Sequence, residues 1–372
     1  MKNPEKAKIF DISRFLFASF TGFLGGHLTN YSVILYAQDV WNSDMLAGIG
    51  FGLCFGTPLI LGWFGGAWCD SHSPQKIAQL AHISFLISLS LLSITPIVSE
   101  DVSRYVFLTG ATFAGIGWAV LAPARMALLG RLAENKQAKL AVIFNILVML
   151  GFGAAPPLLS LCKKIGGWEI VHYSGMGLFM LSMVALIGLK AVGLGHESSA
   201  IDRIRQGVGY VAKTPLLKEA ILFAIIVYLS MGPVQVMLPR FATNVLALSE
   251  IGRGLFLGAM ALALLVGGGV SLGIAKKFGF GKMILVSGMT SGLAICALGA
   301  SSSVEMSAVF LLFSGAGAGV SISLIVALLQ SESKPEYRGR LMSLYTITSQ
   351  VIPAFSGFLS GLVLVKLPVN EA

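Results

Sequence analysis

Charged residues are scarce in this chain of 372 residues. Asp, Glu, Lys and Arg make up only 12% of it, about half the usual share in a soluble domain, whereas 55% is hydrophobic. So few charges cannot cover a globule of this length, which excludes an ordinary soluble enzyme, a nucleic-acid-binding module and a disordered protein. The composition indicates an all-α polytopic membrane protein, because a chain in hydrocarbon must satisfy its backbone hydrogen bonds internally.

Signatures of metals and cofactors are also missing. The four cysteines form no CxxC pair, the five histidines have no HExxH spacing, and no GxxxxGK[ST] loop occurs. We therefore expect no metal site, no cofactor, no disulfide framework and no enzymatic activity, with the cysteines serving as small core residues.

Long apolar runs are abundant. About twenty apolar residues span a bilayer, and the chain contains eleven such runs, at 13–37, 44–68, 75–97, 103–130, 138–162, 169–191, 215–242, 249–275, 282–300, 305–330 and 339–365. We predict an N-terminal six-helix bundle (1–191), a cytoplasmic linker (192–214) and a C-terminal five-helix bundle (215–372). In the linker, Ile201, Ile204, Val208 and Val211 share one face of a short amphipathic helix.

Basic residues fall unevenly between these runs. With the N-terminus in the cytoplasm, most of the 26 Lys and Arg residues lie in inner segments, whereas the 17 acids divide almost evenly. This is the positive-inside pattern of a multi-pass protein of the cell (inner) membrane. It explains the net charge of +9 without an anionic partner, so we expect a monomer in a lipid bilayer that binds no nucleic acid.

The two halves of the chain repeat one another. Asp44, Gly48 and Gly52 are followed by Lys76 with the same spacing as the later set Glu250, Gly254, Gly258 and Lys282. Duplicated halves are typical of secondary transporters, whose substrate site lies near the midplane between the repeats.

Two loops carry a family motif in eroded form. The first reads Gly66-Ala-Trp-Cys-Asp70 and continues to Lys76, and the second runs from Lys276-Lys277 to Lys282. They resemble the Gly-xxx-Asp-Arg-x-Gly-Arg-Arg loops of the major facilitator superfamily, although Ser71 stands in place of the arginine and Ser73 in place of the second glycine. The resemblance implies a cytoplasmic gate, whose residues here are Gly66, Asp70, Lys76, Lys276, Lys277, Lys282, Arg338 and Arg340.

Other stretches resemble one branch of that superfamily, the bacterial exporters similar to the enterobactin exporter. They are IRQGVGYVAKTPLLKEAI, LPRFATNVLALSEIGRGLF, PEYRGRLMSLYTI and LAPARMALLGRLA. The superfamily has twelve spans, so the resemblance implies that the twelfth is either absent from the protein or cut from this sequence.

Polar residues within spans are costly and therefore informative. The resemblance implies that spans 1, 4, 7 and 10 line the cavity, which predicts substrate contacts at His27, Asn30, Trp118, Tyr228 and Gln235. Asn145 on span 5 and Gln350 on span 11 are further candidates, because they too are polar residues within spans. The alternative is hydrogen bonding between helices of one half. Because no Asp or Glu falls in the middle of a span, His27 is the candidate for proton coupling. Arg125 either attracts an anionic group of the substrate or extends to lipid phosphate.

Small residues predict close helix crossings. The expected packing positions are Gly52, Gly56, Gly254, Gly258, Gly357, Gly361 and, at a kink in the fifth span, Pro156.

These features predict a secondary active transporter, an exporter of a small amphipathic organic compound of siderophore-like or drug-like character that works by alternating access, with protons as a candidate coupling ion. Two alternatives remain open: a flippase for lysophospholipids or similar amphiphiles without ion coupling, and a scaffold that transports nothing.

Overall fold

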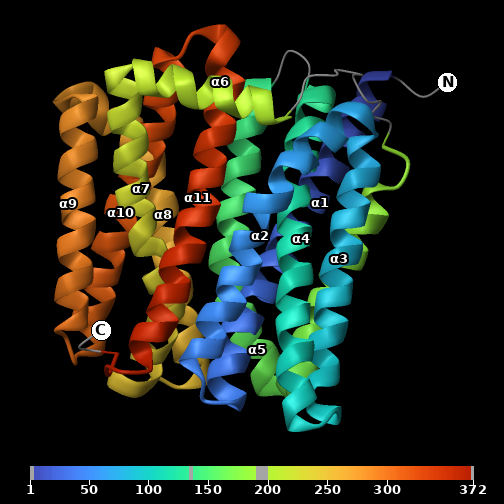
Figure 1. Ribbon diagram of the computed structural model, residues 1–372, viewed down its shortest axis with the longest axis vertical. Helices are drawn as coiled ribbons and strands as arrows, with labels where there is room; N and C mark the ends of the chain where they lie inside the picture. Colours follow the sequence, from blue (N-terminus) through green and yellow to red (C-terminus); the bar gives the residue numbers. More distant parts are fainter. Residues whose placement is uncertain (1–3, 134–136, 190–199, 370–372) are drawn as a thin grey trace. The chain divides into compact units, whose positions relative to one another are not determined.

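The computed structural model describes residues 4–133, 137–189 and 200–369, and this part of the chain is helical with no strand (Figure 1). The all-α prediction is therefore confirmed. The helices are α1 (Pro4–Val40), α2 (Asp44–Ser71), α3 (Pro74–Ile94), α4 (Glu100–Ala133), α5 (Gln137–Leu186), α6 (Ala200–Lys213), α7 (Pro215–Arg240), α8 (Glu250–Phe278), α9 (Phe280–Gly299), α10 (Val304–Glu332) and α11 (Pro335–Leu364). A short 3-10 turn, η1 (Thr95–Ile97), follows α3, and a π-helical turn, η3 (Phe241–Val245), follows α7.

Helix α5 consists of two spans joined by two glycines. Gly166 (φ −159°, ψ 34°) and Gly167 (φ 68°, ψ −161°) leave helical geometry, and the second of these conformations is open to glycine alone. The predicted spans 138–162 and 169–191 correspond to its two parts. Together with α1, α2, α3, α4 and α7–α11, α5 therefore accounts for the eleven predicted spans.

Length and hydropathy support membrane insertion. Within the described ranges, nine helices, with α5 counted once, are long and apolar enough to cross a bilayer. Helix α1 is not among the nine, because His27, Thr29 and Asn30 interrupt its apolar run. Helix α9 exposes Leu285, Met289 and Leu293 on one stripe, at 54%, 65% and 67% of their surface. A stripe of large apolar side chains that faces outward is expected of a helix in contact with lipid.

Local sequence signals set several helix starts. Pro74, Pro215 and Pro335 occupy the first turns of α3, α7 and α11, where a missing N–H removes no helical hydrogen bond. The Ser249 hydroxyl accepts from the Gly252 N–H at 3.2 Å at the start of α8, and the Ser303 hydroxyl accepts from the Met306 N–H at 3.4 Å at the start of α10. Both serines are N-caps.

Contacts between residues divide the chain into two compact units. The first unit holds residues 1–36 and 53–200, and the second holds 37–52 and 201–372. In the first, α3 packs on α4 and α5; in the second, α10 packs on α8, α9 and α7, and α11 packs on α7. The end of α1 and the first turns of α2 thus belong with the second unit, although they are far from the rest of it in the sequence.

Glycines allow backbones to touch inside the second unit. A Cβ on Gly319 of α10 would overlap the Leu264 carbonyl of α8, and a Cβ on Gly267 of α8 would overlap the Ala316 carbonyl. Small residues at such crossings are the usual basis of tight helix packing in membranes.

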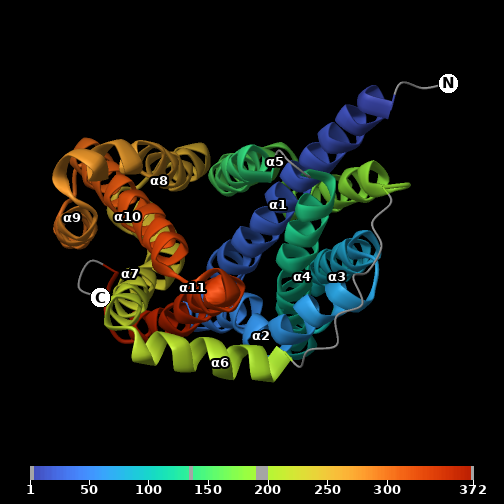
Figure 2. The same ribbon diagram turned by 90° about the horizontal axis from the view of Figure 1, so that it is seen from above.

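The linker forms α6, which lies crosswise to α7 and α11 (Figures 1 and 2). The ring of Tyr210 stacks on Tyr337 of α11, with 4.4 Å between centroids and 9° between planes, and its hydroxyl accepts from the Lys334 N–H at 3.1 Å. Of the four residues predicted on the apolar face, Val211 is buried and Val208 is 46% exposed, whereas the side chains of Ile201 and Ile204 lie outside the described residues.

Candidate functional site

A polar cluster lies within the aromatic core of the first unit. The indole N–H of Trp118 (α4) donates to Asn30 Oδ1 (α1) at 2.9 Å, and the His27 ring lies 5.0 Å from the rings of Trp118 and Phe152. Gly26 makes this approach possible, because a Cβ there would stand 2.7 Å from the indole. Three sequence-predicted residues, His27, Asn30 and Trp118, are thus brought together.

Several polar atoms of this cluster are unused. Both ring nitrogens of His27 and Nδ2 of Asn30 are buried and make no hydrogen bond. A buried polar atom without a partner costs about 1–3 kcal/mol. An arrangement of unpaired donors and acceptors among aromatic rings is typical of a site that hydrogen-bonds a ligand.

More aromatic rings surround Trp118. Phe23, Phe55 and Phe85 lie 6.0, 6.1 and 5.6 Å from it between centroids, and Phe85 meets it edge to face. The polar atoms of His27 and Asn30 are thus set in an apolar, aromatic environment.

The structure contradicts both sequence-based interpretations of Arg125. Its side chain is fully buried, so it neither extends to lipid phosphate nor faces an open vestibule. It donates to the Ala18 carbonyl at 2.9 Å and to the Ser182 hydroxyl at 2.7 Å, and lies 3.1 Å from His82 Nε2. No carboxylate among the described residues pairs with it. The guanidinium ties α1, α3, α4 and α5 together, and nothing in the sequence marked His82 or Ser182 as its partners.

The remaining predicted contact residues lie elsewhere. In the second unit, Tyr228 is buried and its hydroxyl lies 2.7 Å from that of Tyr345 on α11, while Gln235 is buried and Gln350 is half-buried. In the first unit, Asn145 is exposed on α5. Of the predicted substrate contacts, His27, Asn30, Trp118 and Asn145 thus belong to the first unit, and Tyr228, Gln235 and Gln350 belong to the second.

The predicted gating residues make few contacts. Lys76, Lys276, Lys277 and Lys282 are exposed, and within the described residues none of them forms an ion pair. Arg340 lies over the Tyr337 ring at 5.2 Å. Gly66 and the side chains of Asp70 and Arg338 lie outside the described residues.

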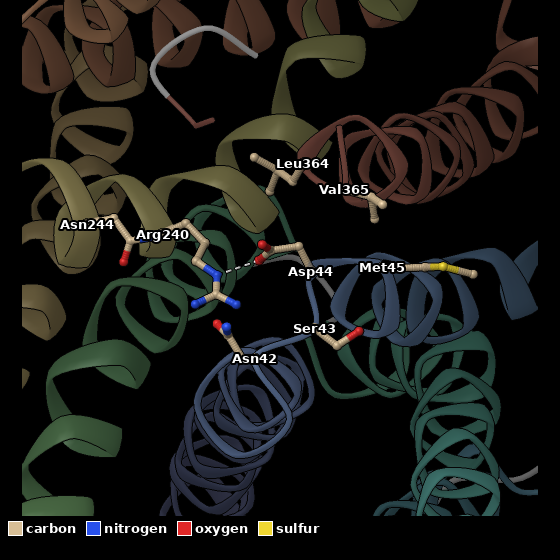
Figure 3. Close-up of a pocket in the computed structure, with 8 residues that line it drawn as sticks. All are labelled: Asn42, Ser43, Asp44, Met45, Arg240, Asn244, Leu364 and Val365. Atoms are coloured by element: carbon tan, nitrogen blue, oxygen red, sulfur yellow. Dashed lines mark hydrogen bonds and ion pairs between the residues drawn. The ribbon is translucent and has the colours of Figure 1, made fainter. Parts of the chain in front are cut away.

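The charge contacts of the second unit lie instead where α1 ends and α2 begins. Arg253 (α8) makes two hydrogen bonds of 2.9 Å to the Asp39 carboxylate and one of 2.7 Å to Glu250. Arg240 (α7) donates through Nε to Asp44 Oδ1 at 2.6 Å (Figure 3). We call these five residues the ion-pair cluster.

Gln38 adds hydrogen bonds to the ion-pair cluster. Its side-chain amide donates to Asp44 Oδ1 and to the Val236 carbonyl, both at 2.9 Å. The cluster holds the end of α1 and the start of α2 against α7 and α8. One signal in the sequence pointed to this cluster. Few basic residues lie outside the inner segments, and two of them, Arg240 and Arg253, are at the outer helix ends, where the predicted topology also puts these acids.

Predicted packing glycines lie beside the cluster. A Cβ on Gly361 (α11) would stand 2.8 Å from the Cα of Gly48 (α2), and one on Gly357 would overlap the Phe51 ring. A Cβ on Gly52 would meet Phe358 at 3.4 Å. The other predicted packing positions are buried or half-buried; they are Gly56, Gly254, Gly258 and Pro156.

In the described ranges, no three His, Cys, Asp or Glu side chains are placed so that they could hold a metal ion.

Comparison with known proteins gives the family. Residues 15–364 match the model of the Major Facilitator Superfamily. The chain is 25% identical over 370 residues to the enterobactin exporter EntS of Shigella boydii serotype 4 (strain Sb227), covering 97% of this chain and 86% of the relative. The same figures hold for the enterobactin exporter EntS of Escherichia coli O139:H28 (strain E24377A / ETEC).

Solved structures agree on the fold. An inward-facing, unoccupied bacterial homologue of the human lysosomal transporter Spinster superposes with a TM-score of 0.74 at 13% identity, covering 96% of this chain and 82% of that one. An inward-facing bacterial homologue of the iron transporter ferroportin gives 0.72 at 16% identity, with 97% and 92% covered. The chain belongs to the Major Facilitator Superfamily, and it is a membrane transporter of small molecules rather than an enzyme.

Proposed function

We propose that this transporter exports a small amphipathic organic compound, siderophore-like or drug-like, by alternating access. The observation that carries the proposal is the cluster of His27, Asn30 and Trp118. It offers a ligand unpaired hydrogen-bonding atoms within a wall of aromatic rings.

The chemistry of this cluster selects the substrate class. A neutral imidazole has one donor and one acceptor nitrogen, and the Asn30 amide adds a donor. These groups suit a neutral polar edge, while Trp118 and Phe152 suit a flat apolar body. The names of the relatives, enterobactin exporters, support the direction of transport.

The topology is part of the proposal. We place the N-terminus in the cytoplasm, as the basic residues predict. The ion-pair cluster then lies at the outer ends of α1, α2, α7 and α8, and the turn between α10 and α11 lies at the inner end.

Flux through proteoliposomes tests the export proposal. Trp118→Ala removes the buried indole together with its hydrogen bond to Asn30, and we expect uptake of a fluorescent aromatic amphiphile into inverted vesicles to fall sharply. Trp68→Ala is the matched control, because the Trp68 side chain is 45% exposed on α2. Equal flux in both variants would overturn the assignment of this site.

Proton coupling by His27 is tested in the same vesicles. We expect His27→Ala to abolish the part of the flux that an imposed pH gradient drives, while His172→Ala, which removes another buried histidine of the same unit, keeps it. Gradient-driven flux that persists in the His27 variant would show that the coupling role is wrong.

One observation favours a second candidate, an ion-independent flippase for lysophospholipids. No Asp or Glu side chain among the described residues is buried, so none is placed as an intramembrane proton carrier. Transport of a fluorescent lysolipid that is insensitive to a collapsed pH gradient would select this function over the exporter.

A further inference from the structure

A polar cavity lies beside the Asp44–Arg240 ion pair, on the second unit. Its volume is about 410 Å³, and it is lined by Asn42, Ser43, Asp44, Met45, Arg240, Asn244, Leu364 and Val365 (Figure 3). All these residues belong to the second unit. None of them belongs to the His27–Asn30–Trp118 cluster, whose residues lie in the first unit.

The hydrogen-bonding groups at this cavity are largely unused. Arg240 donates to Asp44 through Nε alone. Within the described residues, the N–H groups of its two Nη atoms therefore have no protein partner. The side-chain amides of Asn42 and Asn244 likewise make no hydrogen bond there and are exposed. Four groups that can donate to an anion therefore line one cavity.

The cavity also offers a place for a cation. Asp44 accepts both of its hydrogen bonds, from Arg240 and from Gln38, through Oδ1, which leaves Oδ2 without a partner in the described residues. A guanidinium end prefers phosphate or carboxylate, and a carboxylate oxygen prefers an ammonium group. A simple anion would be repelled by Asp44 and a simple cation by Arg240, so the pair together favours a ligand that carries both charges.

Apolar side chains border the polar groups. Met45 is 46% exposed and Val365 61% exposed, and Leu364 lies next to Val365 at the end of α11. They lie at the ends of membrane helices, where a lipid headgroup meets its acyl chains. This border suits a ligand whose charged head continues into an apolar tail.

We propose that this cavity binds a zwitterionic head group, with a phosphate on Arg240, Asn42 and Asn244 and an ammonium on Asp44. The ligand is either a free zwitterion of this kind or the head of a phospholipid such as phosphatidylethanolamine. Its lining comes from residues 42–45 on one side and from α7, η3 and α11 on the other. Binding therefore stabilises the packing of residues 37–52 against the rest of the second unit.

Calorimetric titration of the purified protein with O-phosphoethanolamine tests the proposal. Ethanolamine alone and inorganic phosphate alone serve as controls for each charge. We expect phosphoethanolamine to bind at least about tenfold more tightly than either, the factor that 1.4 kcal/mol represents. Binding of either single-charge probe as strong as that of phosphoethanolamine would overturn the zwitterion assignment.

Variants locate the binding. Asn42 has φ 46°, which glycine adopts without strain, so Asn42→Gly combined with Asn244→Ala removes both amides and leaves the ion pair intact. We expect affinity to fall at least about tenfold, since each lost hydrogen bond to a charged group contributes about that factor or more. Gln206→Ala, which removes an exposed amide on α6, is the matched control and should bind as the parent protein does.

A second substitution distinguishes the loss of a ligand contact from misfolding of the protein. Arg240→Lys keeps a cation beside Asp44 but lacks the two Nη groups, and it too should weaken binding while the thermal unfolding midpoint without ligand stays near that of the parent. Unchanged affinity in both the double variant and the Arg240 variant would place the ligand elsewhere.

Lipid nanodiscs distinguish the two sources of the ligand. If the headgroup of the bilayer enters the cavity, discs of phosphatidylethanolamine will compete with phosphoethanolamine, and discs of phosphatidylglycerol will not. If only free zwitterions enter, affinity will be equal in both discs. Either result upholds the site and names its source, and neither depends on the transport proposal, because no flux is measured.

Discussion

Neutralising Asp39 should loosen the packing of residues 37–52 without unfolding the protein. In the parent, the Asp39 carboxylate makes two hydrogen bonds of 2.9 Å to Arg253, whose side chain is only 5% exposed. Asp39→Asn keeps the size and shape of the side chain but removes its negative charge. The bidentate pair is replaced by weaker contacts to a neutral amide.

The expected magnitude follows from burial. Breaking a fully buried pair costs about 3–5 kcal/mol. The Asp39 side chain is 21% exposed and Glu250 still pairs with Arg253, so we expect about 1.5–3 kcal/mol, the range of a hydrogen bond to a charged group. Each 1.4 kcal/mol changes an equilibrium tenfold, so the population with this segment detached should rise about 10- to 100-fold.

Thiol accessibility measures that population. Ala47 is completely buried on α2 within residues 37–52, and Ala47→Cys in a background without the native cysteines should react with a maleimide only when the segment detaches. We expect labelling of Asp39→Asn/Ala47→Cys to be faster by the same 10- to 100-fold factor. Asp11→Asn is the matched control, because Asp11 is a 41% exposed acid 3.6 Å from Arg14, and its neutralisation should leave labelling unchanged.

Two results would refute this reasoning. One is a labelling rate in the Asp39 variant equal to that of the parent. The other is the same acceleration in the Asp11 variant, which would mean that net charge rather than the Asp39–Arg253 contact controls the segment.

Three further predictions concern thermal stability in detergent. Arg125→Met should destabilise by about 1–3 kcal/mol, because it removes the buried hydrogen bonds that join α4 to α1 and α5, and an unchanged or raised unfolding midpoint would contradict this. Gly361→Ala should destabilise by about 1–3 kcal/mol, since the new Cβ would stand 2.6 Å from the Asp44 carbonyl oxygen, and an unchanged unfolding midpoint would argue against that contact. Gly167→Ala should lower the free energy of unfolding by about 1–3 kcal/mol, because alanine is strained in the backbone conformation of Gly167. Gly177→Ala, where the backbone is helical and the space equally open, should not lower it, and equal effects of the two variants would refute the backbone argument.

The sequence predicted those features that depend on local composition. Runs of apolar residues predicted eleven spans, and all of them fall on helices; nine helices of the described ranges, with α5 counted once, are apolar enough to cross a bilayer. The spacing of apolar residues around Val211 predicted α6, which the structure contains. The polar residues of span 1 were singled out because buried polar groups are rare, and His27 and Asn30 do lie in one cluster with Trp118.

Features that depend on distant contacts were not predictable in this way. Asp39 and Arg253 are 214 residues apart, and each alone reads as an ordinary charge near a helix end. Arg125 was misread because its partners, His82 and Ser182, belong to other helices and carry no signal of their own. The association of residues 37–52 with the second unit likewise depends on which surfaces meet, and periodicity within a segment does not contain that information.

The glycine contacts between α2 and α11 have a mechanical consequence. Where Gly48 meets Gly361, main chain faces main chain, and no interlocked side chains must be withdrawn or change rotamer for the two surfaces to part. Close main-chain contact of this kind gives tight packing, whereas the neighbouring salt bridges are charge contacts that added salt screens. Salt should therefore weaken the ion pairs and leave the contact between the glycines unchanged.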